Sequence, residues 1–387
     1  MRIAIFSDTF PPQVNGVANT VNESAKALAN QGHQVSVFTI SNNSKKLLND
    51  KKNNLAIVVL PSLPALVYQN ERFGLPSWAH LDRLKKFNPD IVHIHTPFMV
   101  GWQGIWWAKK LKVPVVGTHH TFYDHYLKHI KMDYNWTKKF SWKYTVAYYN
   151  HCDLVLSPSR SLAEELTAHG LKKPIEIIQN PIDTNLFRPA TDIAEKAKAK
   201  KSFGVNGQAV VYMGRLSYEK SVDQVVKAFA LMLEKLPDLK LMLIGDGPEK
   251  NNLEKLSKTL GLKNKVIFTG VLRGENLVKA LWANDIFITA SKTENLPVSV
   301  LESMAAGLPI IAVKEKGLAE IIKENTNGFF VQTDNPKDIS ARTVFLLSRP
   351  ELMEKFSRAS RSLSLDYSKE KVATLLENLY QKVLKQA

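Results

Sequence analysis

The sequence is poor in cysteine, with Cys152 as its single example among 387 residues. One cysteine excludes an intramolecular disulfide framework and fits a reducing compartment such as the cytoplasm. Apolar runs are also short: the most apolar one, 98–107, contains two glycines and falls well below the roughly 20 residues that cross a bilayer. A strand is expected at 2–7, so we expect no secretory signal. These features predict a cytoplasmic protein without a membrane-spanning helix.

Acidic residues are too few to balance the basic ones. The chain has 52 lysines and arginines against 36 aspartates and glutamates, a formal charge of +16. Such an excess predicts attraction to nucleic acid, to an anionic lipid surface or to a phosphorylated substrate, although a lysine-rich source organism would also produce it. Because no nucleic-acid-binding module is found, we do not expect nucleic acid as the partner.

Metal-binding patterns are missing too. Nowhere do two aspartates stand two positions apart, so the common Asp-x-Asp motif for a metal-bound diphosphate is absent. Two histidine pairs occur on or after expected strands, His93 with His95 and His119 with His120. Histidines in such places are more often core or cleft residues than metal ligands. We therefore expect no metal and no cofactor.

Apolar runs alternate with amphipathic helical patterns from end to end. A hydrophobic content of 44% with 23% charged residues indicates a globular protein, and the length suits two domains. The expected strands are 3–6, 35–40, 56–60, 91–94, 113–118, 154–157, 175–178, 209–213, 240–244, 265–269, 286–289, 309–313 and 328–331. Near-continuous Val, Ile and Leu runs between helices favour parallel sheets covered on both faces. We predict an α/β protein of two Rossmann-like domains.

The domain boundary is expected in the turn-rich segment 180–189. This gives an N-terminal domain at 1–185, a C-terminal domain at 186–365 and a final helix at 366–387 that packs back on the N-terminal domain. Ligands of open parallel sheets bind beyond the carboxyl ends of the strands. With two such sheets facing each other, the cleft between the domains is the expected active site.

Glu294 and Glu302 flank an expected strand-to-helix junction. We expect Asn295 to cap the helix and Pro297 to occupy its first turn. The backbone N–H groups of a helix start attract phosphate. Carboxylates on either side of that start would suit the hydroxyl groups of a sugar, although two glutamates eight apart are more often solvated surface.

Further polar motifs follow other expected strands. Arg215 and Lys220 come after Gly214, where a guanidinium fork and an ammonium group would bind a diphosphate; a solvated turn is the alternative. Gly245 opens a tight loop that suits a nucleotide but lacks the third glycine of a dinucleotide fingerprint. Gly16 joins the first strand to a helix, where a backbone without a side chain can approach a phosphate.

The segment 122–149 interleaves aromatic and basic residues. A helix of this composition lies flat on anionic bilayers. A helix that buries its aromatic side chains in the core and exposes its lysines to water would have the same sequence pattern. The candidate membrane-binding residues are Lys128, Lys131, Trp136, Lys138, Lys139 and Trp142. The segment 63–87 is a second candidate of the same kind.

Taken together, these motifs resemble those of retaining GT-B glycosyltransferases of the family-4 type, along nearly the whole chain. Glu294 and Glu302 match the family's Glu-x7-Glu element, and the segment from Gly214 to Lys220 matches its diphosphate clamp. The segment 114–121 matches the strand carrying the family's active-site histidine, which is His120 here, while His119 takes the place of a variable neighbour.

The resemblance implies a role for each residue. Arg215 and Lys220 would stabilise the leaving diphosphate, Glu302 would hold the ribose, and His120 would contact the donor sugar. The implied catalytic residues are His120, Arg215, Lys220 and Glu294, and the implied donor-binding residues are Gly16, Gly214, Gly245, Val271, Asn295, Leu296, Val298 and Glu302. The N-terminal domain would bind the acceptor and the C-terminal domain the nucleotide sugar.

The resemblance also implies a reaction that needs no metal. In such enzymes the leaving phosphate oxygen accepts the acceptor hydroxyl's proton on the same face of the sugar, so no carboxylate nucleophile is required, unlike in retaining glycosidases. The segment 119–130 looks like that of diacylglycerol glucosyltransferases. We therefore expect transfer of glucose from UDP-glucose to diacylglycerol by a peripheral enzyme on the inner face of the cell membrane. The alternatives are a GDP-mannose-dependent phosphatidylinositol mannosyltransferase, a non-lipid glycosyltransferase and a sugar-nucleotide epimerase.

Overall fold

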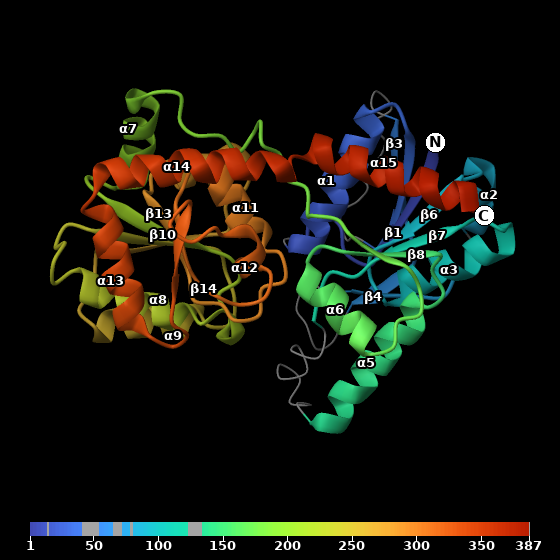
Figure 1. Ribbon diagram of the computed structural model, residues 1–387, viewed down its shortest axis with the longest axis horizontal. Helices are drawn as coiled ribbons and strands as arrows, with labels where there is room; N and C mark the ends of the chain where they lie inside the picture. The colour runs from blue at the N-terminus through green and yellow to red at the C-terminus, as the bar shows by residue number, and fades with distance from the viewer. Residues whose placement is uncertain (14, 41–53, 65–71, 78–79, 123–133, 387) are drawn as a thin grey trace. The chain divides into compact units, whose positions relative to one another are not determined.

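The computed structural model of the protein forms two compact units (Figure 1). It describes residues 1–13, 15–40, 54–64, 72–77, 80–122 and 134–386. Unit 1 consists of Met1–Pro181 together with Lys369–Ala387, and unit 2 consists of Ile182–Ser368. Each unit has helices around its own parallel sheet, so the predicted α/β architecture of two Rossmann-like domains is confirmed.

Unit 1 is built on a seven-stranded sheet with the order β3-β2-β1-β6-β7-β8-β9, and every neighbouring pair in it is parallel. Its strands are β1 (Arg2–Ser7), β2 (Gln34–Thr39), β3 (Leu55–Val59), β6 (Ile91–Ile94), β7 (Val115–Thr118), β8 (Leu154–Ser157) and β9 (Ile175–Ile177). The central strands β6, β7 and β8 are buried throughout, which explains their near-continuous apolar sequence.

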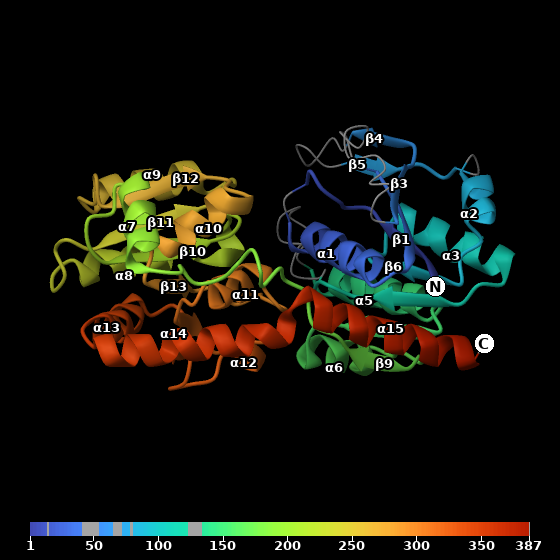
Figure 2. The same ribbon diagram turned by 90° about the horizontal axis from the view of Figure 1, so that it is seen from above.

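Helices cover both faces of this sheet (Figure 2). One face packs against α1 (Gly16–Asn30) and the C-terminal α15 (Lys369–Gln386). The other face packs against α2 (Leu81–Phe87), α3 (Met99–Leu111), α5 (Asn135–Tyr149) and α6 (Arg160–Ala168). A short antiparallel pair, β4 (Ser62–Pro64) and β5 (Arg72–Gly74), lies beside α3. The final helix is therefore part of the core of unit 1.

Unit 2 is built on a six-stranded parallel sheet with the order β12-β11-β10-β13-β14-β15. Its strands are β10 (Ala209–Met213), β11 (Lys240–Ile244), β12 (Val266–Gly270), β13 (Ile286–Thr289), β14 (Ile310–Val313) and β15 (Gly328–Val331). Its helices are α7 (Ile193–Ser202), α8 (Val222–Met232), α9 (Lys250–Thr259), α10 (Gly274–Trp282), α11 (Val298–Ala305), α12 (Leu318–Ile321), α13 (Pro336–Leu347) and α14 (Pro350–Ser364), with short 3-10 turns at η4 (Tyr218–Lys220) and η5 (Leu365–Tyr367).

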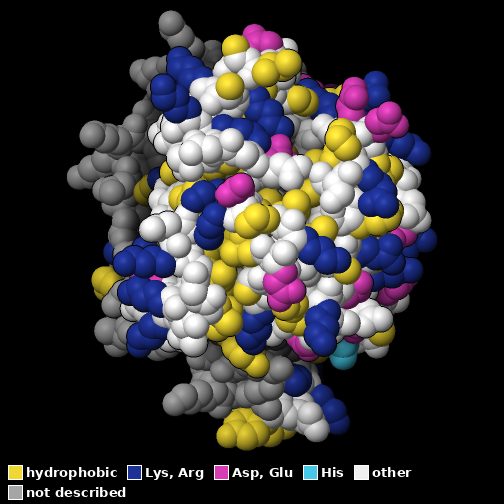
Figure 3. Space-filling model, turned by 90° about the vertical axis from the view of Figure 1, so that its left-hand side faces the viewer, with side chains coloured by type: hydrophobic (Ala, Val, Ile, Leu, Met, Phe, Trp, Pro, Cys, Tyr) yellow, Lys and Arg dark blue, Asp and Glu magenta, His cyan; other side chains and the backbone are white. Residues whose placement is uncertain are grey.

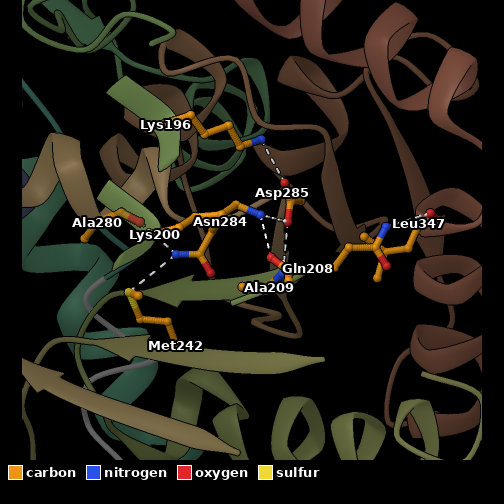
Figure 4. Close-up of polar contacts among 10 residues, drawn as sticks. Lys196, Lys200, Gln208, Ala209, Met242, Ala280, Asn284, Asp285 and Leu347 are labelled. Atoms are coloured by element: carbon orange, nitrogen blue, oxygen red, sulfur yellow. Dashed lines mark hydrogen bonds and ion pairs between the residues drawn. The ribbon is translucent and has the colours of Figure 1, made fainter. Parts of the chain in front are cut away.

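The amino ends of the unit 2 strands are held by a polar network around Asp285 (Figure 4). Its carboxylate accepts hydrogen bonds from Lys196 Nζ at 2.8 Å, Lys200 Nζ at 3.0 Å and the backbone N–H of Ala209 at 2.9 Å. Burial alone would raise the pKa of Asp285, but the two ammonium groups outweigh it and hold the pKa below its usual value. This network joins α7 to the sheet and leaves the carboxyl ends of the strands to the candidate site.

The chain passes between the units at two neighbouring points. The backbone N–H of Ile182 donates to Tyr367 O at 2.9 Å, and Ile182 forms an isolated parallel bridge with Ser368. The segment that leaves unit 1 is therefore hydrogen-bonded to the segment that returns to it. No helix among the described residues is long and apolar enough to span a bilayer.

Candidate active site

The first residues after β10 and β11 are hydrogen-bonded to the last residues of the strands beside them. The backbone N–H of Gly214 donates to Ile244 O at 3.0 Å, and that of Gly245 donates to Gly270 O at 2.9 Å. A Cβ atom on Gly245 would lie 2.0 Å from Gly214 O, and Gly245 has a φ of +135°. Only glycine fits this position without strain. The predicted residues Gly214 and Gly245 thus lie together at the carboxyl edge of the unit 2 sheet.

Lys220 and Glu294 form an ion pair at the same edge. Lys220 Nζ lies 2.7 Å from Glu294 Oε1, and each side chain is 17% exposed. Lys220 ends η4 after β10, whereas Glu294 follows β13, which pairs directly with β10. A pair this shielded from water attracts more strongly than an exposed one, although its desolvation offsets part of the gain. The sheet order therefore joins two motifs that the sequence shows 74 residues apart.

Arg215 lies beside this pair in sequence, with its side chain exposed. Its carbonyl oxygen accepts a hydrogen bond from the hydroxyl of Tyr212 at 3.1 Å. Burial raises the pKa of Tyr212, and the charges of Glu294 and Glu219 raise it further, so the phenol keeps its proton and remains a donor. Tyr212 thereby fixes the backbone from which the Arg215 guanidinium extends.

The helix start after Glu294 differs from the sequence expectation. Helix α11 begins at Val298, and its cap is Pro297, with φ −72° and ψ 116°. Asn295 is buried in the preceding loop and is not the cap. The expected assignment is wrong because Pro297 is held in extended rather than helical backbone. The helix start nevertheless lies next to Leu296, so its partial positive charge is still placed after β13.

Two other predicted donor residues lie within α11 and directly after β12. Glu302 is half-buried inside α11, and Val271 is exposed directly after β12. The loop at Asn295 is packed tightly: a Cβ atom on Gly317 would lie 1.1 Å from Asn295 O, and Gly317 N donates to Glu294 O at 3.3 Å. The backbone of Gly317, the residue before α12, thus supports the position of Glu294.

Gly16 and His120 belong to unit 1, apart from the donor residues of unit 2. Gly16 is the first residue of α1, and the Asn15 side chain caps that helix by accepting from Ala18 N at 2.8 Å. His120 follows β7, at the carboxyl edge of the unit 1 sheet. Both residues therefore occupy strand-to-helix or strand-to-loop connections at the edge where ligands of such sheets bind.

His120 is part of a buried group of histidines. Its Nε2 lies 2.9 Å from His95 Nδ1, and the two rings are nearly parallel, with an interplanar angle of 16° and centroids 5.2 Å apart. Burial lowers the pKa of His120 to about 3 and the pKa of His95 well below its usual value. Both rings are therefore neutral at physiological pH. The neighbouring His119 packs instead against the rings of Trp142 and Tyr149.

Sequence reasoning missed Asp8, which directly follows β1. Its carboxylate accepts hydrogen bonds from Thr96 Oγ1 at 2.7 Å and from Val100 N at 3.1 Å, in the first turn of α3. Burial raises the pKa of Asp8 to about 6, although these hydrogen bonds lower it in part. The available signal was its position at the carboxyl end of the first strand, which is where the other candidate residues lie.

The candidate membrane-binding residues do not all lie on one surface. Trp136 is 65% exposed on α5, and Lys139 is exposed beside it. Trp142 is only 7% exposed and stacks on His169 with ring centroids 4.3 Å apart, so its assignment to a membrane surface is wrong. It faces the core because α5 turns that side toward the sheet. Lys138 is half-buried, and Lys128 and Lys131 lie outside the described residues.

Among the described residues there is no group of three or more His, Cys, Asp or Glu side chains that would hold a metal ion. The reaction's independence of metal remains a prediction.

Comparison with known proteins identifies the family to which the chain is related. The model of the family described as Glycosyltransferase Family 4 matches residues 14–186, and that described as Glycosyl transferases group 1 matches residues 194–363. The chain is similar to the alpha-monoglucosyldiacylglycerol synthase of Streptococcus pneumoniae, with 32% identity over 85% of this chain and 74% of the relative. It is 26% identical to the protein of the same name from Acholeplasma laidlawii, over 98% of this chain and 96% of that one.

Solved structures agree on the fold. Anabaena HepE, crystallised with UDP and glucose, superimposes with a TM-score of 0.77 and 18% identity over 98% of this chain and 99% of that chain. This match confirms the GT-B architecture. The family matches, together with the 32% identity to the Streptococcus pneumoniae enzyme, show that the chain belongs to the family-4 and group 1 glycosyltransferases and is a nucleotide-sugar-dependent hexosyltransferase.

Proposed function

We propose that the protein transfers glucose from UDP-glucose to diacylglycerol, with retention of configuration and without a metal ion, at the inner face of the cell membrane. The observation that carries this proposal is the similarity to two alpha-monoglucosyldiacylglycerol synthases, one of them along almost the entire chain. The geometry of the two sheet edges supports it.

The diphosphate of the donor would bind at the carboxyl edge of the unit 2 sheet. Lys220 is held by Glu294, Arg215 is exposed in the loop between β10 and Lys220, and α11 starts four residues after Glu294. Negative charge grows on the diphosphate as the sugar leaves, and preorganised positive charges stabilise it most at that moment. This arrangement supplies two side-chain cations and a helix N-terminus, which is the work a metal ion performs in other transferases.

The donor sugar would contact His120. Because burial lowers the pKa of His120 to about 3, the ring is neutral at pH 7 and does not donate a proton as an imidazolium. It would orient a sugar hydroxyl by a neutral hydrogen bond. The proton of the acceptor hydroxyl then passes to the leaving phosphate oxygen, on the face from which the acceptor attacks. Retention follows without a carboxylate nucleophile.

The exposed side of α5 provides the membrane-binding surface in this proposal. Trp136, Phe140 and Tyr144 follow one another at intervals of four residues and are all exposed, with Lys139 and Lys143 along one side. Residues four apart lie on one helix face, and aromatic side chains with lysines suit the interface of an anionic bilayer. By contrast, the face of unit 2 in Figure 3 mixes basic, acidic and apolar side chains and forms no comparable surface.

A matrix of donors and acceptors tests the proposal. UDP-glucose, UDP-galactose and GDP-mannose are each incubated with diacylglycerol vesicles or phosphatidylinositol vesicles, and the lipids are analysed by mass spectrometry. We expect hexosylated diacylglycerol from UDP-glucose as the main product, unchanged by EDTA. Mannosylated phosphatidylinositol would instead establish the GDP-mannose alternative. Isomerisation of UDP-N-acetylglucosamine alone would indicate an epimerase.

A further inference from the structure

His95 follows β6, next to the strand that leads to His120. Its side chain is 2% exposed. The Nδ1 atom of His95 lies 2.9 Å from His120 Nε2, while its Nε2 atom is buried and has no hydrogen-bond partner among the described residues. Only one of the two nitrogen atoms of this ring is therefore hydrogen-bonded among the described residues, and its partner is His120.

The unpartnered nitrogen decides which ring donates. A neutral imidazole has one N–H group, so a hydrogen bond between two neutral rings needs one donor and one acceptor. If His120 donated, the proton of His95 would be on Nε2, a buried N–H without an acceptor. Buried N–H groups without a partner are rarer and more costly than buried acceptors without one. The arrangement with the proton of His95 on Nδ1 avoids that cost.

We propose that His95 is a positioning residue for sugar transfer: its Nδ1–H donates to His120 Nε2 and thereby keeps the proton of His120 on Nδ1. This inference rests on the proposed function, because it assigns a purpose to the role of His120 at the donor sugar. In this tautomer His120 presents an N–H donor to a hydroxyl oxygen of the sugar. The opposite tautomer would present a lone pair.

The surroundings hold the His95 ring in this orientation. The ring of His93 lies against it, with centroids 4.1 Å apart. His93 is itself fixed at both nitrogen atoms, by the Tyr380 hydroxyl at 2.6 Å from Nδ1 and by Thr118 Oγ1 at 2.7 Å from Nε2. Tyr380 comes from α15. The C-terminal helix thus contributes to the rigid packing that sets the direction of the His95 N–H.

Two nearly isosteric substitutions separate hydrogen bonding from packing. In His95→Asn, the amide nitrogen takes nearly the place of Nδ1 and still donates; in His95→Leu, nothing donates. We expect His95→Leu to lower kcat at least about tenfold with an almost unchanged KM for UDP-glucose, and His95→Asn to recover most of that loss. His119→Leu removes a neighbouring buried imidazole without removing this hydrogen bond, and we expect a much smaller change in kcat. Equal kcat values for the Leu and Asn variants of His95 would contradict the proposal.

Nuclear magnetic resonance of the wild-type protein tests the tautomer without any turnover. With 15N-labelled histidine and His120→Gln for assignment, we expect the His120 proton on Nδ1 and the His95 proton on Nδ1. A proton on His120 Nε2 would overturn the proposal even if glucose transfer is observed. Conversely, the expected tautomers together with no transfer from UDP-glucose would contradict the proposed function and leave the hydrogen bond assignment intact.

Discussion

Lys220 and Glu294 lie 2.7 Å apart at the carboxyl edge of the unit 2 sheet, each largely shielded from water. In the proposed function, the two charged side chains have different partners before and after the donor binds. Without the donor, Glu294 neutralises Lys220 and fixes its position. In the proposed function, the diphosphate of the bound donor would offer Lys220 a stronger anionic partner, and Glu294 would turn its other carboxylate oxygen toward the sugar. One ion pair would thereby prepare both the leaving group site and the sugar site.

The first prediction concerns this pair. Lys220→Met should reduce kcat at least about 100-fold, because a cation that stabilises the leaving diphosphate is lost and Glu294 is left without its partner. The surface pair of Lys227 and Asp223, 2.8 Å apart on α8, provides a control. Lys227→Met should leave kcat within about twofold, since exposed pairs contribute little. If both lysine variants kept normal turnover with UDP-glucose, the diphosphate site would be assigned wrongly.

The second prediction concerns Gly317. A Cβ atom there would lie 1.1 Å from Asn295 O, so Gly317→Ala must move the loop that carries Glu294. We expect the affinity for UDP, measured by calorimetry, to fall at least about tenfold, because a shift of the order of 1 Å misaligns the binding groups. Gly207→Ala is the control, since a Cβ atom there meets nothing within 4 Å. Unchanged affinity in the Gly317 variant would show that this loop does not hold the donor.

The third prediction concerns the exposed side of α5. Replacing Trp136 and Phe140 by serine should weaken sedimentation with anionic vesicles at least about tenfold, while UDP binding stays the same, because the helix loses the side chains that enter the bilayer interface. Ile193→Ser changes an exposed apolar residue of unit 2 instead and should have no effect. Equal sedimentation of all three proteins would remove α5 from the membrane surface.

The fourth prediction is a loss of stability in mild acid. Burial lowers the pKa of His93, His119 and His120 from 6.5 to about 3, and that of His95 falls as well. Below pH 6.5 the unfolded chain takes up protons that the folded chain refuses. The free energy of unfolding therefore decreases as the pH is lowered below 6.5, by at most about 1.4 kcal/mol per histidine for each pH unit. Burial raises the pKa of Asp8 to about 6, so protonation of this carboxyl stabilises the folded state as the pH is lowered. This single group opposes the effect of four histidines.

Urea unfolding at pH 7.5 and 5.5 measures this effect. We expect a clearly lower midpoint at pH 5.5 for the transition of unit 1. The His119→Leu variant keeps three of the four histidines whose pKa burial lowers in this group, and it should show a smaller difference between the two pH values. Identical midpoints for the wild type at both pH values would mean that these histidines are hydrated or charged in the folded protein.

Much of this architecture could be predicted because buried parallel strands leave a plain signal. The run at 209–213 and the run at 286–289 are apolar throughout, and the polar residues that follow them fall at one sheet edge for geometric reasons. The pairing of Lys220 with Glu294 depends in addition on β10 lying next to β13. That order is a property of the tertiary structure, and the motif spacing alone does not contain it.

The remaining differences have local causes. Aromatic residues occur on both sides of α5, so periodicity did not distinguish the exposed Trp136 from the buried Trp142. Asp8 is a single carboxylate after a strand and belongs to no spaced pattern. The hydrogen bond between His95 and His120 joins residues 25 positions apart. It depends on β6 lying beside β7, which the sequence alone does not show.

The anomeric configuration of the lipid product tests the central claim most directly. Purified protein is incubated with UDP-glucose and diacylglycerol vesicles, and the glycolipid is examined by proton nuclear magnetic resonance. Because glucose is α-linked in UDP-glucose, a retaining transfer to diacylglycerol gives an α-glucosyl lipid. A β-glucosyl lipid would contradict the same-face mechanism, and release of free glucose without any glycolipid would contradict the acceptor.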